Sequence, residues 1–147
     1  MFSFFMRWIL GDEIEKNTIK HASKGEYTKT NRLKGGGHGQ EAIEYMDKNN
    51  IQYTITKTYP NGVRIGNVPH HAHIRKRTGD NQSWFPKKWN REIIQKAGKC
   101  VSRGKKYKDG VTKSGKYKNV KVGIIRTHGK IATIFPLKEQ NNFRRKR

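Results

Sequence analysis

Gln40-Glu-Ala-Ile-Glu-Tyr-Met-Asp-Lys-Asn49 is followed, after one residue, by Ile51-Gln-Tyr-Thr-Ile55, and the hydrophobic period changes between these two segments. In the first segment Ile43 and Met46 stand three residues apart, as they would on one face of a helix. In the second segment the three apolar residues alternate with polar ones, which is typical of a half-buried strand. The change of period therefore predicts a short helix that leads into a β-strand.

The flanking segments extend this pattern into a mixed α+β fold with antiparallel sheets. The turn signal Pro60-Asn61-Gly62 predicts that the chain returns as a second strand. A helix is expected over residues 12–23, and strands over 63–68 and 82–85. Pro86 is expected to open a second helix, with Trp89, Ile93 and Ala97 on one face. The last expected element is a hairpin of strands 120–124 and 131–135 around His128-Gly129. The glycine- and lysine-rich segments 27–38 and 99–119 are expected to be loops.

Length and composition predict one domain with a modest core. The chain has 147 residues, of which 32% are hydrophobic, and its mean hydropathy is −1.02, so only a single small core is expected. Three Trp, six Tyr and six Phe still supply anchors for packing, which argues against full disorder. Cys100 is the one cysteine, which excludes an internal disulfide and disfavours a cysteine-based zinc site.

The charge of the chain points to a polyanionic or acidic partner. There are 33 Lys and Arg against 11 Asp and Glu, so the net charge is +22, and the pI is 10.4. Such a charge destabilises a compact state through self-repulsion, so we expect it to serve binding to a nucleic acid or an acidic protein. A basic surface that serves only solubility is the alternative.

The two ends of the chain are expected to lie outside the domain proper. The apolar opening, residues 1–10, is too short to span a membrane, and Gly11-Asp-Glu13 stands where a signal peptide would need small residues. We therefore expect residues 1–18 to be an extension or the remnant of a junction with a longer protein. Residues 138–147 are expected to be a solvated basic tail that can also touch phosphates. No membrane anchor is predicted.

Three short motifs carry the chemistry: His21-Ala-Ser-Lys-Gly25, Gly35-Gly-Gly-His38 and Thr133-Ile-Phe135-Pro136. Histidine can both accept and donate a proton near neutral pH, and two such groups can hold the opposite protonation states that acid–base catalysis needs. On a strongly basic chain, this pair suggests a metal-free ribonuclease. The structural alternatives are that His21 only interacts with the dipole at the end of a helix and that Thr133 is an ordinary strand residue.

In their order and spacing these motifs resemble the EndoU endoribonuclease family. The segments Gln82-Ser-Trp-Phe-Pro86 and Ala132-Thr-Ile-Phe-Pro136 are particularly similar to its bacterial polymorphic-toxin branch. The resemblance covers residues 19–136, and we expect the nuclease domain to occupy 19–137. It implies a ribonuclease-A-like α+β fold, which agrees with the order of elements predicted above.

The resemblance also implies a mechanism and roles for individual residues. His38 would be the general base that takes the 2′-hydroxyl proton, and His21 the general acid that protonates the leaving 5′-oxygen, giving a 2′,3′-cyclic phosphate. A Lys or Arg and backbone N–H groups of the glycine loop, including Gly37, would stabilise the phosphate charge. Thr133 would contact the base, and Phe135 would stack on it or lie in the core. No cofactor or metal is required.

The catalytic lysine is where the chain departs from the family pattern. Gln82 stands at the position where the family usually has this lysine, so the charge must come from a neighbouring residue. Lys76 and Lys87 are the two candidates, and Lys76 is favoured because it follows a predicted strand. Gln82 itself, Trp84 and His71 are the remaining residues expected to contact RNA.

A metal-binding alternative comes from three neighbouring histidines, His70, His71 and His73. An extended strand would bring only His71 and His73 to one face, and no carboxylate or cysteine cluster stands nearby to complete a metal site.

The sequence therefore leaves three candidate functions. The first is an EndoU-type toxin in interbacterial competition, secreted or delivered from the cell surface, acting on RNA such as tRNA in the target-cell cytoplasm and neutralised by an acidic immunity protein. The alternatives are a metal-dependent nuclease toxin and a non-catalytic RNA-binding protein. The sequence leaves the oligomeric state open.

Overall fold

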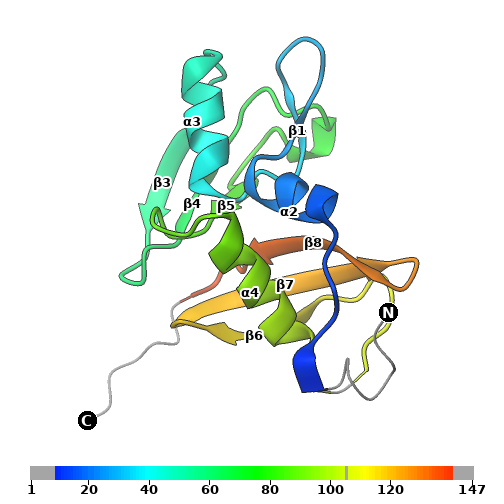
Figure 1. Ribbon diagram of the computed structural model, residues 1–147. Helices are drawn as coiled ribbons and strands as arrows, with labels where there is room; N and C mark the ends of the chain where they lie inside the picture. The colour runs from blue at the N-terminus through cyan, green and yellow to red at the C-terminus, as the bar shows by residue number, and fades with distance from the viewer. Residues whose placement is uncertain (1–8, 105, 141–147) are drawn as a thin grey trace.

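The computed structural model describes residues 9–104 and 106–140 (Figure 1). In chain order the elements are α2 (Lys16–Ser23), β1 (Glu26–Tyr27), β2 (Leu33–Gly35), α3 (Gln40–Lys48), β3 (Thr54–Thr58), β4 (Arg64–Asn67), the 3₁₀ turn η1 (Ile74–Lys76), β5 (Gln82–Trp84), α4 (Arg91–Ser102), β6 (Lys113–Tyr117), β7 (Val120–Thr127) and β8 (Lys130–Pro136). The strands form three antiparallel sheets, in the orders β1-β2, β3-β4-β5 and β6-β7-β8. The predicted α+β class is confirmed.

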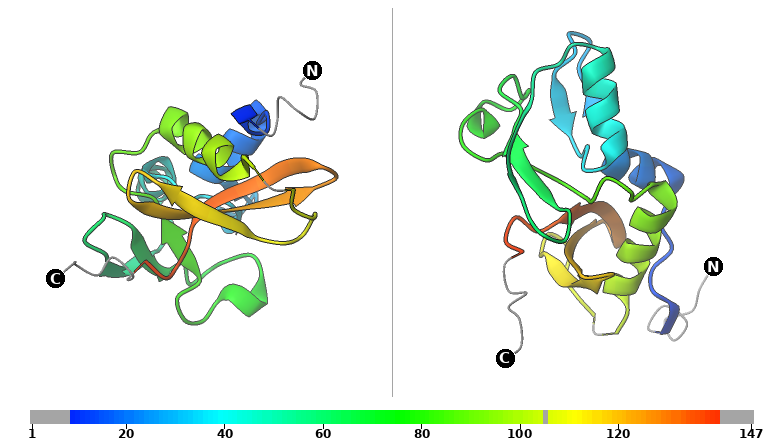
Figure 2. Two further views of the ribbon diagram at one scale, coloured as in Figure 1. Left: turned by 90° about the horizontal axis from the view of Figure 1, so that it is seen from below. Right: turned by 90° about the vertical axis from the view of Figure 1, so that its left-hand side faces the viewer.

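The larger core lies between the β6-β7-β8 sheet and the helices α2 and α4, which cover the same face of this sheet (Figure 2). Inward residues of β7 such as Val122 and Ile124 are fully buried against α4 residues such as Ile94 and Ala97. Burying such side chains stabilises the fold by about 1.5–3 kcal/mol each. The loop that carries η1 lies on the opposite side of the sheet (Figure 2).

A smaller core joins α3 to the β3-β4-β5 sheet. Met46 of α3 and Trp84 of β5 are fully buried there, together with Leu33 of β2. Helix α2 contacts β8 and α4 on one side and α3 on the other, so its end lies where the two cores meet. Among residues 9–104 and 106–140, no helix has the length and apolar character needed to cross a bilayer.

Several predicted elements are confirmed. Helix α3 occupies Gln40–Lys48, and strands β4 and β5 lie within the predicted ranges. The C-terminal hairpin is formed by β7 and β8, with His128 and Gly129 in the turn at φ of 54° and 76°. Both residues need a left-handed backbone conformation, which is what a tight two-residue hairpin requires.

Both predicted loops contain regular structure, so these predictions were wrong. The segment 27–38 includes most of the small β1-β2 hairpin, and the segment 99–119 contains the last turn of α4 and the strand β6. Strand β6 is rich in Lys and Gly, but its backbone pairs with β7 over its whole length. Gly115 lies against α4, where a β-carbon would make an ordinary van der Waals contact of 3.4 Å with Val101. Backbone pairing thus outweighs weak strand propensity.

Three element boundaries also differ from prediction. Helix α2 begins at Lys16 rather than at residue 12, and the strand expected over 51–55 lies at Thr54–Thr58, where Ile55 is 39% exposed. Helix α4 begins at Arg91, because the Asn90 side chain accepts a hydrogen bond from the Ile93 amide and caps the helix there. The Pro86 segment precedes the helix. Residues 1–8 of the expected extension and residues 141–147 of the expected tail lie outside the described residues.

Candidate active site

The two histidine motifs are held together through the C-terminal end of α2. The amides of Gly37, His38 and Gly39 donate to the carbonyls of His21, Ala22 and Ser23, at 2.9, 2.6 and 3.0 Å. These carbonyls belong to the last turn of the helix and have no partner within it. The glycine segment therefore caps α2, and in doing so it fixes His38 beside His21.

Two glycines make this close backbone contact possible. A β-carbon on Gly36 would lie 2.0 Å from the carbonyl oxygen of His21, and one on Gly25 would lie 2.8 Å from the α-carbon of Gly37. Gly36 and Gly25 also have φ of +64° and +90°, which disfavours any L side chain. The glycines of both motifs are thus explained by the approach of the two segments.

The cap engages backbone amides of the glycine loop that were expected to bind phosphate. The amides of Gly37 and His38 are already bonded to α2 carbonyls, and Gly37 is buried. They are not available to a phosphate in this structure. The expectation that the Gly37 backbone binds phosphate is therefore corrected, because that N–H group holds the helix end instead.

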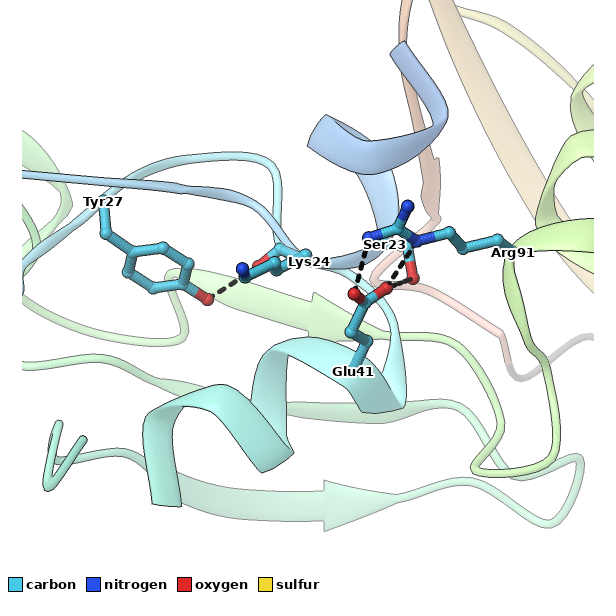
Figure 3. Close-up of polar contacts among 5 residues, drawn as sticks. All are labelled: Ser23, Lys24, Tyr27, Glu41 and Arg91. Carbon is cyan, nitrogen blue, oxygen red and sulfur yellow. Dashed lines mark hydrogen bonds and ion pairs between the residues drawn. The ribbon is translucent and has the colours of Figure 1, made fainter. Parts of the chain in front are cut away.

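A salt-bridged cluster fastens the same helix end to α3 and α4 (Figure 3). The Glu41 carboxylate accepts from Ser23 Oγ at 2.9 Å and from Arg91 Nε and Nη2 at 2.8 and 2.6 Å. The hydrogen bonds from Arg91 lower the pKa of Glu41, and Ser23 adds to this effect. On the other side of Ser23, Tyr27 donates its hydroxyl proton to the Lys24 carbonyl at 2.7 Å. The cluster ties α3 and α4 to the end of α2, the helix that carries His21.

Both histidines open onto one cavity of about 630 Å³. Its wall comes from α2, β2, η1, β5, β7, β8 and the loops between them, so residues far apart in sequence meet there. The lining residues that matter chemically are His21, Gly36, His38, His71, Arg75, Lys76, Asp80, Gln82, Thr133, Phe135 and Lys138. The structure thus brings both histidines, Lys76, Gln82, His71, Thr133 and Phe135 of the predicted site to one place.

His38 is held in one tautomer. Its Nδ1 lies 2.7 Å from the Ser83 carbonyl oxygen, an acceptor only, so Nδ1 carries the proton and Nε2 has the free lone pair. Burial lowers the pKa of His38 to about 4; the hydrogen bond to Ser83 opposes this shift, and the positive charges of His21, Lys76 and Lys138 add to it. The ring is therefore neutral at neutral pH and able to accept a proton.

His21 has a different environment. It is half-buried at the end of α2, and its Nδ1 lies 3.2 Å from Oε2 of Glu26. The carboxylate can pair with the imidazolium through Nδ1, which leaves Nε2 as the ring nitrogen available to a ligand. One histidine is therefore bonded to a neutral carbonyl and the other to a carboxylate, an asymmetry that suits a base and an acid respectively.

Of the two lysine candidates, only Lys76 reaches this cavity. Lys87 lines a separate depression beside Glu41 and Arg91. A second lysine, Lys138, lines the active-site cavity with Lys76; its Nζ donates to the Asp80 carbonyl at 2.6 Å. Burial and the neighbouring Lys76 lower the pKa of Lys138.

Gln82 and Trp84 of β5 stabilise the fold around the cavity. Gln82 is buried, and its amide donates to the carbonyls of Gly36 and Gly37 at 2.9 and 2.8 Å. It therefore orders the glycine turn while still lining the cavity. Trp84 is fully buried in the smaller core, so the structure leaves it no surface for the expected RNA contact.

The Thr-x-Phe-Pro motif on β8 forms the opposite wall. Thr133 and Phe135 are half-buried and line the cavity, and the Phe135 ring lies 5.9 Å from the His38 ring, centre to centre. Ser83 Oγ donates to the Pro136 carbonyl at 2.9 Å, which joins β5 to β8 at this point. Phe135 thus presents an aromatic face beside the proposed base.

His71 is a third histidine in the cavity, with the opposite tautomer to His38. It is 2% exposed, and its Nδ1 accepts from the His73 amide at 3.1 Å, so Nε2 carries the proton. Burial, with the charge of Lys76 next, lowers its pKa to about 4. His70 lies on the other side of this segment and lines a different cavity. Across the described residues, no three His, Cys, Asp or Glu side chains are grouped so as to hold a metal ion.

Three contributors were missed by sequence reasoning. Ser83 acts through its backbone carbonyl, which leaves no signature in the sequence. Glu26 follows Gly25 directly, and a carboxylate beside the first motif was the signal that could have identified it. Lys138 stands two residues after the Thr-x-Phe-Pro motif and was assigned to the basic tail.

Comparison with known proteins agrees with this geometry. No curated protein sequence and no solved structure matched the chain. A family profile described as "Bacterial EndoU nuclease" matches residues 15–138, which is most of the chain and includes both histidine motifs, β5 and β8. The chain belongs to the bacterial EndoU nuclease family.

Proposed function

We propose that this nuclease is an endoribonuclease that cleaves RNA by transphosphorylation. His38 Nε2 takes the proton of a 2′-hydroxyl, and the 2′-oxygen forms a bond to the adjacent phosphorus. The bond from phosphorus to the 5′-oxygen breaks, and His21 supplies the proton to that oxygen. The products are a 2′,3′-cyclic phosphate and a free 5′-hydroxyl, and atoms and charges balance without a co-reactant.

The observation that carries the proposal is the hydrogen bond of 2.7 Å between His38 Nδ1 and the Ser83 carbonyl. It leaves the lone pair of Nε2 free beside a second histidine in the same cavity. The low pKa of His38 keeps this lone pair unprotonated at neutral pH. When RNA binds, its phosphate charge favours the protonated imidazole and so strengthens the base at the moment it is needed.

Lys76 and Lys138 are proposed to stabilise the charge on the non-bridging phosphate oxygens. Both line the cavity with the two histidines, and an ammonium group can follow the oxygens as charge develops. Their combined role supplies the charge that Gln82 lacks. Thr133 and Phe135 are proposed to hold the base, Phe135 by stacking.

We also propose that the protein acts as a toxin in interbacterial competition. The support is the resemblance of its motifs to the toxin branch, together with the net charge of +22. In this role it would be secreted or delivered from the cell surface, cut RNA such as tRNA in the cytoplasm of the target cell, and be neutralised by an acidic immunity protein. Charge complementarity accelerates both RNA binding and inhibitor binding.

The test is incubation of purified protein with total RNA in EDTA, followed by analysis of the fragment ends. Wild type is compared with His38→Ala, His21→Ala and His128→Asn; His128 is exposed in the β7-β8 turn, and Asn tolerates its positive φ. The proposal predicts discrete fragments with 2′,3′-cyclic phosphate ends for wild type and His128→Asn only.

Other outcomes would replace the proposal. Cleavage that needs added metal and persists in His38→Ala would favour a metal-dependent nuclease. Intact RNA with salt-dependent binding would indicate an RNA-binding protein. Equal cleavage of DNA would show that the 2′-hydroxyl is not the nucleophile.

A further inference from the structure

A second cavity of about 630 Å³ lies on the other side of the segment that borders the active site. It is formed by the turn of the β1-β2 hairpin, the chain that leaves α3, and the two ends of the 70–77 segment. Its lining residues are Thr30, Asn31, Arg32, Asn50, Ile51, Gln52, His70 and Arg77. A volume of this size is typical of a ligand site.

The chemistry of this lining is that of a phosphate-binding surface. The side chains that can carry charge are Arg32, Arg77 and His70, and no carboxylate is among them. The others that can form hydrogen bonds are amides and a hydroxyl. Guanidinium, amide and hydroxyl groups are the donors that proteins use toward phosphate and sugar oxygens, and toward the edges of unpaired bases.

The arginines are held in place while keeping donors for a ligand. Arg32 donates from Nε to the His70 carbonyl and from Nη2 to the His71 carbonyl, both at 3.3 Å, and Arg77 donates from Nε to the His71 carbonyl at 3.1 Å. Arginine has five N–H donors, so each guanidinium retains others. Anchored side chains lose less rotamer entropy on binding.

The 70–77 segment connects this cavity to the active site. His71 and Lys76 line the active-site cavity, whereas His70 and Arg77 line the second one. The carbonyl of His71 is the acceptor for both arginines. A strand of RNA that occupies the active site needs only to pass over this short segment to reach the second cavity.

We propose that the second cavity is a subsite for RNA nucleotides that flank the cleaved bond, bound mainly through their phosphates. This inference rests on the proposed function. It makes the enzyme selective for extended RNA: a dinucleotide fills only the active site, whereas a longer strand also uses Arg77 and its neighbours. The gain appears in KM and in the salt dependence, not in kcat.

The test compares dinucleotide substrates with a single-stranded RNA of about 10 nucleotides, which is within the usual footprint of such sites. The variants are Arg77→Gln, which removes a charge, and Gln52→Glu, which adds a negative charge at an exposed position with little change in shape. Their matched controls are Arg103→Gln and Asn17→Asp, at exposed positions that line neither cavity.

For the longer RNA we expect each cavity variant to raise KM about fivefold, the effect of losing one charge-assisted contact. Arg77→Gln should also reduce the slope of log KM against log salt by about 0.7. Dinucleotide kinetics and both controls should stay at wild-type values. Unchanged kinetics on the longer RNA would overturn the inference, and an equal loss on both substrates would assign these residues to the structure of the active site.

A binding measurement separates this inference from the proposed function. Fluorescence anisotropy of the labelled RNA is measured with His38→Ala, with and without Gln52→Glu. Weaker binding in the double variant supports the subsite even if no substrate is cut, and equal binding rejects it.

Discussion

The Nδ1 atom of His38 lies 2.7 Å from the carbonyl oxygen of Ser83, and this single bond decides which nitrogen of the ring faces the cavity. Residue 83 belongs to β5, whose strand pairing with β4 fixes the direction of that carbonyl. The proposed role of His38 as the base thus depends on the sheet of the smaller core, whereas its position beside His21 depends on the end of α2.

The pH dependence of activity follows from the pKa of His38. As the proposed base, His38 must be neutral, so kcat/KM for the free enzyme should fall as pH decreases through about 4. The bound phosphate raises this pKa, so the acid limb of kcat should lie at higher pH than that of kcat/KM. Initial rates across the acid range, with circular dichroism to confirm folding, measure both limbs. Two coincident limbs near 6.5 would contradict a His38 ring that stays neutral at neutral pH.

Stability should also decrease on acidification, and His71 is one identifiable cause. Its pKa is about 4 when folded, against the ordinary value of 6.5, so the unfolded chain binds more protons between these values. Stability supplied by the neutral ring is fully present above 6.5 and is lost as pH falls toward 4. Urea denaturation at several pH values should show a shallower loss for His71→Asn than for wild type. An unchanged slope would remove His71 as a contributor.

The close approach of Gly36 to His21 can be tested with one matched pair of substitutions. Gly36→Ala introduces a β-carbon that would lie 2.0 Å from the His21 carbonyl, whereas Gly110→Ala has a similar positive φ but nothing within 4 Å. Both variants incur the backbone cost of about 1 kcal/mol. Only Gly36→Ala should lose several kcal/mol more and become inactive, because overpacking is added. Urea midpoints and cleavage rates measure this difference, and similar losses in the two variants would refute it.

Substituting each candidate lysine should show which of them stabilise the charge on the phosphate. Lys76→Gln and Lys138→Gln should each lower kcat/KM by about 10²-fold, as expected when a group that stabilises developing charge is removed. Lys87→Gln should leave kcat/KM near wild type, since Lys87 lines a different depression. A loss confined to Lys87→Gln would mean that the substrate approaches from the side of α3 and α4.

Sequence reasoning predicted the parts of the site that depend on side-chain identity. The histidines, Lys76 and the Thr-x-Phe-Pro motif stand out because their residue types carry the chemistry, and the structure places them around one cavity. Glu26 and Lys138 escaped prediction because their positions in the sequence do not by themselves place their side chains beside the histidines. The other missed contributions are made by backbone atoms. The Ser83 carbonyl and the amides that cap α2 can be supplied by any residue type, so only the fold reveals them. The same holds for β6, whose pairing with β7 is not encoded in a hydrophobic pattern.

Replacing each of the two aromatic residues expected to bind RNA by alanine should affect a different property, protein stability for Trp84 and RNA binding for Phe135. Trp84 is fully buried in the smaller core, so Trp84→Ala should destabilise the protein by about 3–5 kcal/mol. Phe135 is half-buried beside His38, so Phe135→Ala should cost less stability but weaken RNA binding by about 1–3 kcal/mol through loss of stacking. Urea denaturation and anisotropy with labelled RNA separate the two effects. Phe135→Leu is the control, because it keeps most of the apolar volume without the stacking face. Restoration of RNA binding by leucine would show that Phe135 acts by packing against β5 and His38 rather than by contact with a base.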